Sequence, residues 1–173
     1  KGGKTDDFFF LESDGDAAQK LVCDLVTTRL PRSYQFDPVK DIQVLCPTKL
    51  GPTGTQALNV ELQALLNPPQ KGRPELQSAA RVFRVGDKVM QVRNNYEITW
   101  QRIGGEQGVG AYNGDIGIVE SIDPRSRSMV VRMDDRRLVY PAGNLNELEL
   151  AYAITVHKSQ GSEFPAVILP AAQ

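Results

Sequence analysis

Two apolar runs near the C-terminal end, residues 152–155 and 166–169, constrain the fold of this chain more than any other feature. Nearly every residue in both runs is apolar, which is typical of strands buried on both faces of a parallel sheet. The polar segment 156–164 lies between them, at the carboxyl end of the first strand. Open α/β sheets bind their ligands at that end. We therefore expect a ligand-binding loop between two buried strands.

The N-terminal part of the chain reads as alternating strands and helices. Residues 8–11 and 41–46 predict strands, and Pro31 is expected to end the helix between them. Apolar residues at helical spacing support that helix and a second one that begins at Thr55; they are Ala17, Ala18, Leu21, Val22, Leu25 and Val26 in the first, and Leu58, Leu62, Leu65 and Leu66 in the second. This β-α-β-α order predicts the α/β class with a parallel sheet.

The pattern changes after residue 80. Residues 83–92 read as a strand, and residues 94–112 read as a glycine-rich, aperiodic loop. Asn113 and Gly114 predict a turn. Short strand candidates follow at 116–120, 129–133 and 138–140, with a spacing that favours a small antiparallel barrel. The predicted boundaries are 1–80 for the first part of the α/β domain, 81–112 for a connecting strand and loop, 113–145 for an inserted barrel and 146–173 for the return of the α/β domain.

Composition sets limits on function. The chain has 173 residues, a net charge of −1 and 40% apolar residues, so any nucleic-acid contact follows a narrow track rather than a broad basic face. Cys23 and Cys46 read as buried thiols in a reducing compartment. There is no Cys/His cluster for a metal, and no apolar run approaches the roughly 18 residues of a membrane span. We expect a cytoplasmic protein with no membrane partner.

The polar segment combines several ligand-binding side chains. Lys158 can hold a phosphate, hydroxyls can bind phosphate oxygens or cap a helix, and Glu163 can accept hydrogen bonds from sugar hydroxyls. Gly161 permits close backbone approach to a ligand. The hydroxyls are those of Thr155, Ser159 and Ser162. His157, the only histidine, either donates to a ligand or orients the loop. The alternative is a solvated connection with no ligand.

In its order, the segment Thr155–Val–His–Lys–Ser–Gln–Gly161 resembles motif V of superfamily 1 helicases, in the form found in the RecD-like, 5′-to-3′ branch. Two further blocks agree with the RecD2 members, also called exodeoxyribonuclease V alpha subunits. The region from Asp41 to Pro68, with its P-x-x-x-G-P-x-G loop, resembles motif IV. The blocks at 86–91 and 112–117 resemble the entry to an SH3-like insertion.

The resemblance implies a partial RecA-like domain, 2A, that carries an inserted SH3-like β-barrel, 2B. It also implies roles for individual side chains. Contacts to single-stranded DNA are implied for Thr155, His157, Lys158 and Ser159. Contacts to the nucleotide are implied for Gln160, Gly161, Glu163 and Lys49, although Leu50 stands where relatives often carry a second cation.

The predicted barrel adds candidate contacts to the DNA backbone, because arginine neutralises phosphate. The candidates are Arg125, Arg127, Arg132, Arg136 and Arg137, with a merely solubilising surface as the alternative. Trp100 and Tyr96 could stack on bases, but packing beneath the glycine-rich loop explains them better.

The parent protein is thereby predicted to be an ATP-dependent DNA helicase that uses ATP and Mg²⁺. Residues 1–5 resemble the end of a phosphate-binding loop but lack its preceding glycine, strand and following helix, and no motif VI precedes residue 173. We therefore predict no catalytic residue and no turnover for the chain alone. We also predict no nuclease activity, because no paired-carboxylate metal site stands out in the sequence. The predicted partners are single-stranded DNA, the N-terminal motor domain and a RecBCD-like complex. The alternatives are part of a conjugative relaxase, an SH3-like module for protein or single-stranded DNA, and a degenerate helicase domain.

Overall fold

The chain forms two compact units in the computed structural model, Lys1–Pro68 together with Tyr152–Gln173, and Pro69–Ala151. Residues 7–11 and 15–170 are described, with side chains from residue 15 onward, so the glycine-rich start at 1–5 lies outside the description. The second unit is inserted within the sequence of the first. It is longer at both ends than the 113–145 segment predicted for the barrel.

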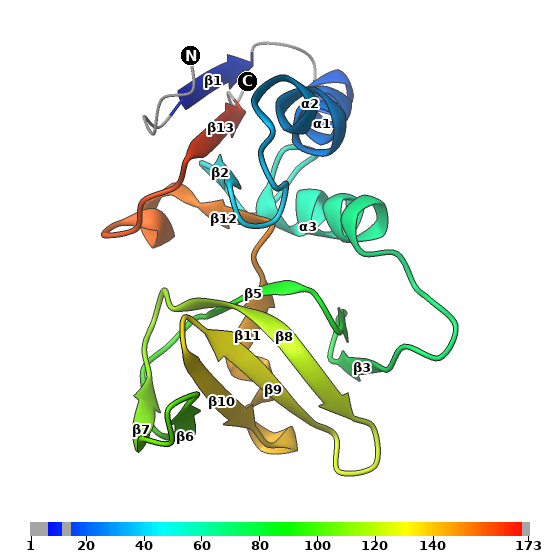
Figure 1. Ribbon diagram of the computed structural model, residues 1–173. Coiled ribbons are helices and arrows are strands. Elements are labelled where there is room, and N and C mark those ends of the chain that lie inside the picture. The colour runs from blue at the N-terminus through cyan, green and yellow to red at the C-terminus, as the bar shows by residue number, and fades with distance from the viewer. Residues whose placement is uncertain (1–6, 12–14, 171–173) are drawn as a thin grey trace. The chain divides into compact units, whose positions relative to one another are not determined.

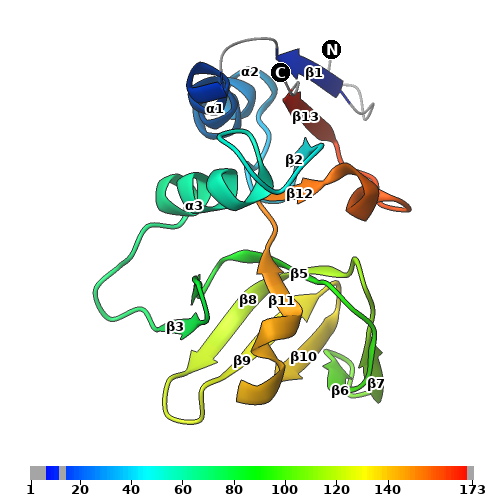
Figure 2. The ribbon, with the colours of Figure 1, turned by 180° about the vertical axis from the view of Figure 1, so that it is seen from behind.

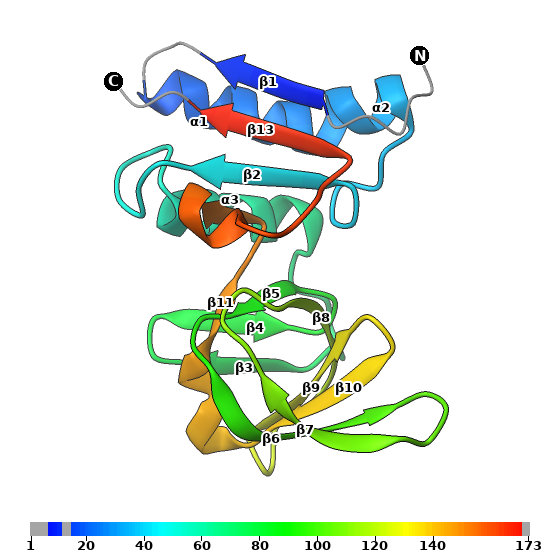
Figure 3. The same ribbon diagram turned by 90° about the vertical axis from the view of Figure 1, so that its left-hand side faces the viewer.

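The first unit is built on a four-stranded parallel sheet (Figure 3). Its order is β1 (Asp7–Leu11), β13 (Ala166–Pro170), β2 (Ile42–Cys46) and β12 (Ala153–Thr155). Every pairing in it is parallel. All residues of β2 and β12 are buried, as their largely apolar sequences predict, and polar Gln43 and Thr155 are buried with them. The four predicted strands are confirmed.

One face of this sheet is covered by helices (Figure 3). The first helical stretch runs through α1 (Gly15–Asp24), the π-helical segment η1 (Leu25–Arg29) and α2 (Leu30–Tyr34). Its buried apolar side chains recur every fourth residue, at Ala18, Val22, Val26 and Leu30. This spacing places them on one stripe facing the sheet.

The expectation that Pro31 ends this helix is wrong. The helix continues to Tyr34 and stops at Gln35, which has a φ of 58°. Proline removes a donor and clashes with the carbonyl four residues earlier, here that of Thr27. Thr27 lies inside η1, where the wider turn lets Leu30 N–H donate to the carbonyl of Leu25, five residues back. The π-helical turn therefore accommodates the proline.

The second helix, α3 (Thr55–Leu66), confirms the predicted start at Thr55 but not the whole predicted face. Leu58 and Leu62 are completely buried, whereas Leu65 is 54% exposed. The positions beside the two buried leucines are taken by Asn59 and Gln63, which are both buried. The stripe that packs on the sheet is therefore partly polar.

The second unit is an antiparallel β-structure (Figure 1). Its seven-stranded sheet has the order β11-β5-β8-β9-β10-β6-β7, and β3 and β4 form a separate hairpin. The strands are β3 (Glu75–Ser78), β4 (Arg81–Arg84), β5 (Lys88–Gln91), β6 (Asn95–Arg102), β7 (Gln107–Ala111), β8 (Ile116–Asp123), β9 (Ser128–Met133), β10 (Arg136–Tyr140) and β11 (Leu148–Leu150). The three short strands predicted between 116 and 140 are confirmed as β8, β9 and β10. Within the described residues, the end strands β11 and β7 do not pair with each other.

The expectation of a glycine-rich loop over 94–112 is wrong, because β6 and β7 form a hairpin there. Gly108 shows why glycine is compatible with this strand. A Cβ on Gly108 would lie 2.3 Å from the indole ring of Trp100, so only glycine lets the ring cross β7. Glycine here serves a close approach within a sheet rather than flexibility.

The return to the parallel sheet begins later than residue 146. The 3-10 helix η2 (Ala142–Glu147) leads into β11, which pairs antiparallel with β5 (Figure 2). Leu148 and Leu150 are buried on either side of the partly exposed Glu149. This alternation is typical of an antiparallel strand with one covered face, which explains why the apolar residues from 148 belong to the second unit.

Candidate functional site

Two polar loops leave the parallel sheet at the same edge. In the parallel pairing of β12 with β2, Thr155 lies opposite Cys46, and both are the last residues of their strands. The loop 47–54 follows β2, and the segment 156–163 follows β12. The structure therefore brings the Lys49 loop and the predicted ligand-binding loop to one edge of the sheet.

The first loop, residues 47–54, is held by its own backbone. Thr55 N–H donates to Thr48 O at 3.2 Å, and Gln56 N–H donates to Lys49 O at 3.1 Å. Gly54 packs so tightly that a Cβ there would lie 2.4 Å from the carbonyl oxygen of Leu50. The exposed side chain of Lys49 thus extends from a fixed turn at the start of α3.

The second loop begins with the 3-10 helix η3 (Val156–Ser159). The hydroxyl of buried Thr155 lies 3.4 Å from Nε2 of His157, which is exposed. Ser159 donates its hydroxyl hydrogen to the carbonyl of Val156 at 2.5 Å, so in this conformation the hydroxyl orders the loop. Gly161 has a φ of 82°, which glycine adopts without strain.

The side chains assigned to a nucleotide or to DNA differ in exposure within this loop. Gln160, Gly161 and Glu163 are exposed, whereas Lys158 is half-buried. All four follow β12 within one short segment. Their predicted roles remain predictions, and their placement is compatible with a ligand at the carboxyl edge of the sheet.

Sequence reasoning missed Asn59, on the buried face of α3. Its side-chain oxygen accepts a hydrogen bond from Ala153 N–H at 2.8 Å, and its Nδ2 donates to Ala153 O at 2.9 Å. Ala153 is the first residue of β12, two positions before Thr155. The signal that could have found it was a polar residue next to Leu58, on the face of the helix that the apolar spacing predicts to be buried.

The predicted arginine contacts belong to the second unit, where the side chains of Arg127 and Arg132 are hydrogen-bonded to backbone carbonyls. Arg127 donates to the carbonyl of Gln77 at 2.6 Å, and Nε of Arg132 donates to Asp134 O at 3.2 Å. Arg125 is exposed in the turn between β8 and β9, where its backbone N–H donates to Asp123 at 3.0 Å. The hydroxyl of Ser126 and the backbone N–H of Arg125 lower the pKa of Asp123.

The two remaining arginine candidates lie on β10 and pair with acids. Nε of Arg137 lies 2.9 Å from a carboxylate oxygen of Glu120, and Arg136 lies 3.9 Å from Asp115. Arg136 also lies over the ring of Trp100, with 5.7 Å to the ring centroid. A merely structural surface explains these contacts as well as a DNA track does.

The aromatic residues of the β6–β7 hairpin separate into two environments. Trp100 packs over Gly108 with the guanidinium of Arg102 5.0 Å from its ring centroid. Tyr96 is instead 66% exposed and meets Tyr112 edge-on at 6.0 Å. Packing beneath a loop was therefore the wrong explanation for Tyr96.

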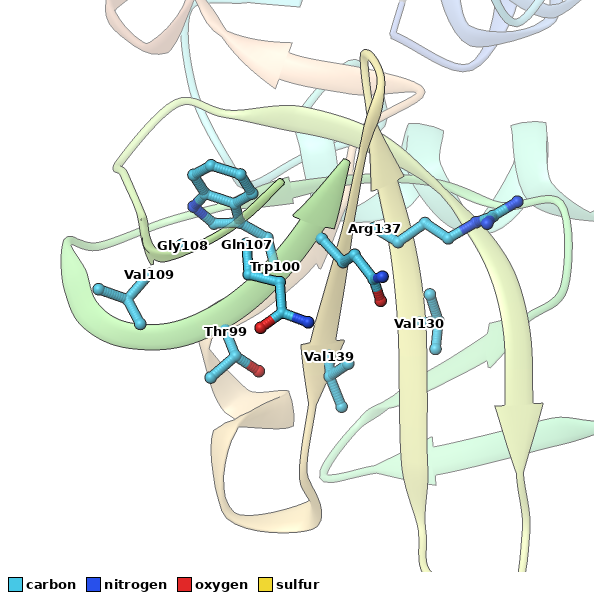
Figure 4. Close-up of a pocket in the computed structure, with 9 residues that line it drawn as sticks. Thr99, Trp100, Gln107, Gly108, Val109, Val130, Arg137 and Val139 are labelled. Carbon is cyan, nitrogen blue, oxygen red and sulfur yellow. The ribbon is translucent and has the colours of Figure 1, made fainter. Parts of the chain in front are cut away.

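A groove opens on the outer face of β6, β7, β9 and β10 (Figure 4). Its cavity volume is about 620 Å³. Thr99, Val130 and Val139 contribute to its wall, and Arg137 is the only charged side chain that lines it. This groove belongs to the antiparallel unit.

A buried polar network holds the second unit together. Glu147 is 4% exposed and accepts hydrogen bonds from Gln91 at 2.8 Å, Asn95 at 2.9 Å and Asn144 at 2.8 Å. Gln91 in turn accepts a hydrogen bond from the hydroxyl of Tyr140 at 2.8 Å. Burial acts to raise the pKa of Glu147, but these amide donors and Arg93 outweigh it, so the pKa is lowered.

Both cysteines are free and buried. Burial raises the pKa of the Cys46 thiol to about 12 and that of Cys23 to about 11. Among the described residues, no group of three or more His, Cys, Asp or Glu side chains could hold a metal ion.

None of the helices in the described part of the chain is long and apolar enough to span a membrane.

Comparisons with known proteins relate both units to DNA helicases. Residues 58–133 match the SH3 domain of ATP-dependent RecD-like DNA helicases. Residues 150–173, which include the loop after β12, match the C-terminal domain of UvrD-like helicases.

Individual relatives agree with these matches. An ATP-dependent RecD2 DNA helicase of Deinococcus radiodurans is 34% identical over 127 residues, 73% of this chain and 16% of the relative. The RecD subunit of the RecBCD enzyme of Mycobacterium tuberculosis is 30% identical over 125 residues, 72% of this chain and 19% of the relative. The RecD subunit of Mycolicibacterium smegmatis is 28% identical over 130 residues, 74% of this chain and 20% of the relative. The chain spans a fifth or less of these relatives, and over most of its length its sequence is similar to RecD-like DNA helicases.

Proposed function

We propose that this chain forms part of the motor of an ATP-dependent DNA helicase that moves 5′ to 3′ along single-stranded DNA. The observation that carries the proposal is the alignment of Thr155 with Cys46, which brings two polar loops to one edge of a parallel sheet in a RecD-like chain. In this proposal the first unit is a RecA-like domain 2A. The second unit is an SH3-like barrel 2B.

In this proposal, different residues of the two loops contact the nucleotide and the DNA backbone. Lys49 and the segment Gln160, Gly161 and Glu163 face the nucleotide, with Lys49 neutralising phosphate and Glu163 accepting from sugar hydroxyls. Lys158 and His157 face the DNA backbone, and Thr155 orients the imidazole from its buried position. Ser159 shapes the loop through its hydrogen bond to Val156.

The residues present fit a nucleotide better than they fit its Mg²⁺. Cationic, hydroxyl and amide groups of the two loops suit phosphate and ribose, whereas the described residues form no carboxylate cluster for a metal. In this proposal two motor domains close on ATP at their interface, and the loops of this chain would contribute one of the two half-sites. We propose that the full-length protein binds ATP and Mg²⁺, and that the chain alone holds neither ligand and does not turn over.

The proposal is tested by fluorescence-anisotropy titration of a labelled single-stranded oligonucleotide in a salt series, with the full-length protein. Lys158→Ala removes a cation at the carboxyl edge of the sheet. Lys40→Ala is the matched control, because exposed Lys40 precedes β2 at the opposite, amino end of that strand. We expect Lys158→Ala to weaken binding by roughly three- to tenfold and to reduce its salt dependence.

The control and further variants define what would contradict the proposal. Equal effects of Lys158→Ala and Lys40→Ala would show a general charge effect and reject the loop as the DNA contact. Arg125→Ala with Arg127→Ala tests the second unit separately. Wild-type protein that neither binds the oligonucleotide nor hydrolyses ATP when DNA is added would reject the helicase assignment. A RecBCD-like assembly is tested by co-purification with the other subunits of such a complex.

A further inference from the structure

We propose that Asn59 is a positioning residue that fixes the loop after β12 relative to the loop that carries Lys49. This inference rests on the proposed function, because it concerns the placement of the same ligand-facing segments. The observation behind it is the pair of hydrogen bonds between the Asn59 carboxamide and the backbone of Ala153.

The carboxamide acts as a substitute for a neighbouring strand. Tyr152 O accepts from Val44 N at 3.5 Å, so the backbone groups of Tyr152 face β2. Directions alternate along a strand, so the N–H and C=O of Ala153 face away from β2, at the end of the sheet. Asn59 binds both of these groups with one side chain, at 2.8 Å and 2.9 Å.

These contacts link the two loops to each other through α3 and the paired strands β12 and β2. β2 leads into loop 47–54, whose carbonyls at Thr48 and Lys49 accept from the first residues of α3. One turn further along α3, Asn59 binds β12, and β12 pairs back onto β2. Each loop is therefore anchored to the same helix, and moving α3 moves both anchors.

Loss of the Asn59 carboxamide leaves the backbone N–H and C=O of Ala153 without a hydrogen-bond partner and shielded from water. Asn59 is 8% exposed and Ala153 is 1% exposed, so water cannot readily replace the carboxamide. An unpaired backbone N–H and C=O then favours a shift of β12 toward solvent. Such a shift is transmitted through two residues to Thr155 and then to His157 and Lys158.

The substitution Asn59→Asp gives a test that distinguishes this role from general destabilisation. A carboxylate can accept from Ala153 N–H but repels Ala153 O, whereas a protonated carboxyl group can make both hydrogen bonds. Burial and the facing carbonyl favour the protonated form. We expect the DNA affinity of Asn59→Asp to be about tenfold below wild type at pH 8 and within about twofold of wild type at pH 5.

The measurement is the ratio of wild-type to variant affinity for a labelled oligonucleotide and for a fluorescent ATP analogue, in the full-length protein, from pH 5 to pH 8. The ratio cancels contributions from titratable and charged groups common to both proteins. On the elements packed around Asn59 these are Asp16, Lys20, Cys23 and Asp24 of α1, Cys46 of β2, Glu61 of α3, and His157 and Lys158 after β12.

Gln63→Glu is the matched control. It makes the same amide-to-acid change at a buried position of the same helix, 7% exposed, one turn beyond Asn59. Its affinity ratio is expected not to recover at low pH in parallel with that of Asn59→Asp. Parallel behaviour of the two variants would overturn the proposal, because burial of a charge in α3 would then explain both.

Hydrogen exchange of the Ala153 amide in the wild-type protein supplies a second measurement that needs no variant to fold. Strong protection is expected, although this amide lies at the end of the sheet. Exchange as fast as that of exposed loop amides would overturn the proposal. Wild-type binding with a pH-independent ratio for Asn59→Asp rejects this inference alone, whereas a wild-type protein that binds neither ligand rejects the proposed function.

Discussion

Thr155 and Cys46 end their strands side by side, although Thr155 lies 109 positions after Cys46 in the sequence. The insertion of a complete antiparallel unit between them leaves this pairing intact. The edge formed by the two strand ends is thus specified by long-range sheet register, and local sequence determines only which side chains the two loops present.

Packing of α3 predicts different stability effects for two leucines that share one helical pattern. Leu62→Ala is expected to lower the free energy of unfolding by about 2–5 kcal/mol, because Leu62 is fully buried. Leu65→Ala removes a 54% exposed side chain and is expected to change it by no more than about 0.5 kcal/mol. Urea unfolding followed by circular dichroism compares the two. A similar loss for both would place Leu65 in the core.

The turn before α3 predicts a graded effect of alanine at two glycines. Gly54→Ala forces a Cβ against the carbonyl of Leu50 and is expected to cost about 2 kcal/mol or more. Gly51→Ala meets no atom within 4 Å but has a φ of 86°, so only backbone strain of about 1 kcal/mol is expected. Thermal unfolding measures both. A larger effect at Gly51 would contradict the tight turn.

The contact between Gly108 and Trp100 can be followed by intrinsic fluorescence, since Trp100 is the only tryptophan. Gly108→Ala places a methyl group against the indole and should displace it toward water, with a red-shifted emission. Gly104→Ala, in the turn of the same hairpin, meets nothing within 4 Å and is the control. Unchanged emission in Gly108→Ala would show that the ring does not cross β7.

The environment of Glu147 predicts that the second unit loses stability at acid pH. Its pKa is lowered in the folded state by the amide donors and Arg93, despite burial that acts to raise it. A lowered folded-state pKa means that the carboxylate stabilises the unit above its unfolded pKa of about 4.3, and that this contribution is lost as pH falls through the folded value.

Glu147→Gln is expected to reduce the loss of stability between pH 7 and pH 3, while lowering stability at pH 7 by roughly 2 kcal/mol because the new amide group faces other donors. Denaturant titrations at several pH values measure both effects. The exposed Glu106→Gln serves as the control, with a carboxylate that pairs only at 3.6 Å with Arg102. An unchanged acid slope in Glu147→Gln would rule out this carboxylate as its source.

Apolar patterning predicted the parallel strands because burial on two faces leaves a nearly continuous apolar run. It predicted both helical segments because one buried face repeats at helical spacing. The predicted loop at 94–112 failed for a different reason. Gly108 fits a strand only because Trp100 crosses it, and this contact between two strands has no local sequence signature. The prediction that Pro31 ends the first helix failed for a similar reason, because the effect of this proline depends on the π-helical turn before it.

The residues of the candidate site also differ in whether the sequence alone could reveal them. The residues of the loop after β12 could be singled out because their types and order are informative. Lys49 could be suspected only from its loop. Asn59 was overlooked because its partner is a backbone group 94 residues away, which only the folded structure reveals.

The carboxamide of Asn59 also determines where this sheet can grow. By occupying the outward backbone groups of Ala153, it closes the rim at β12 to strand addition. A longer polypeptide that extends the sheet would therefore add its next strand beside β1, at the opposite rim. The loop after β12 would then remain at the border of the sheet, with no further strand beside it.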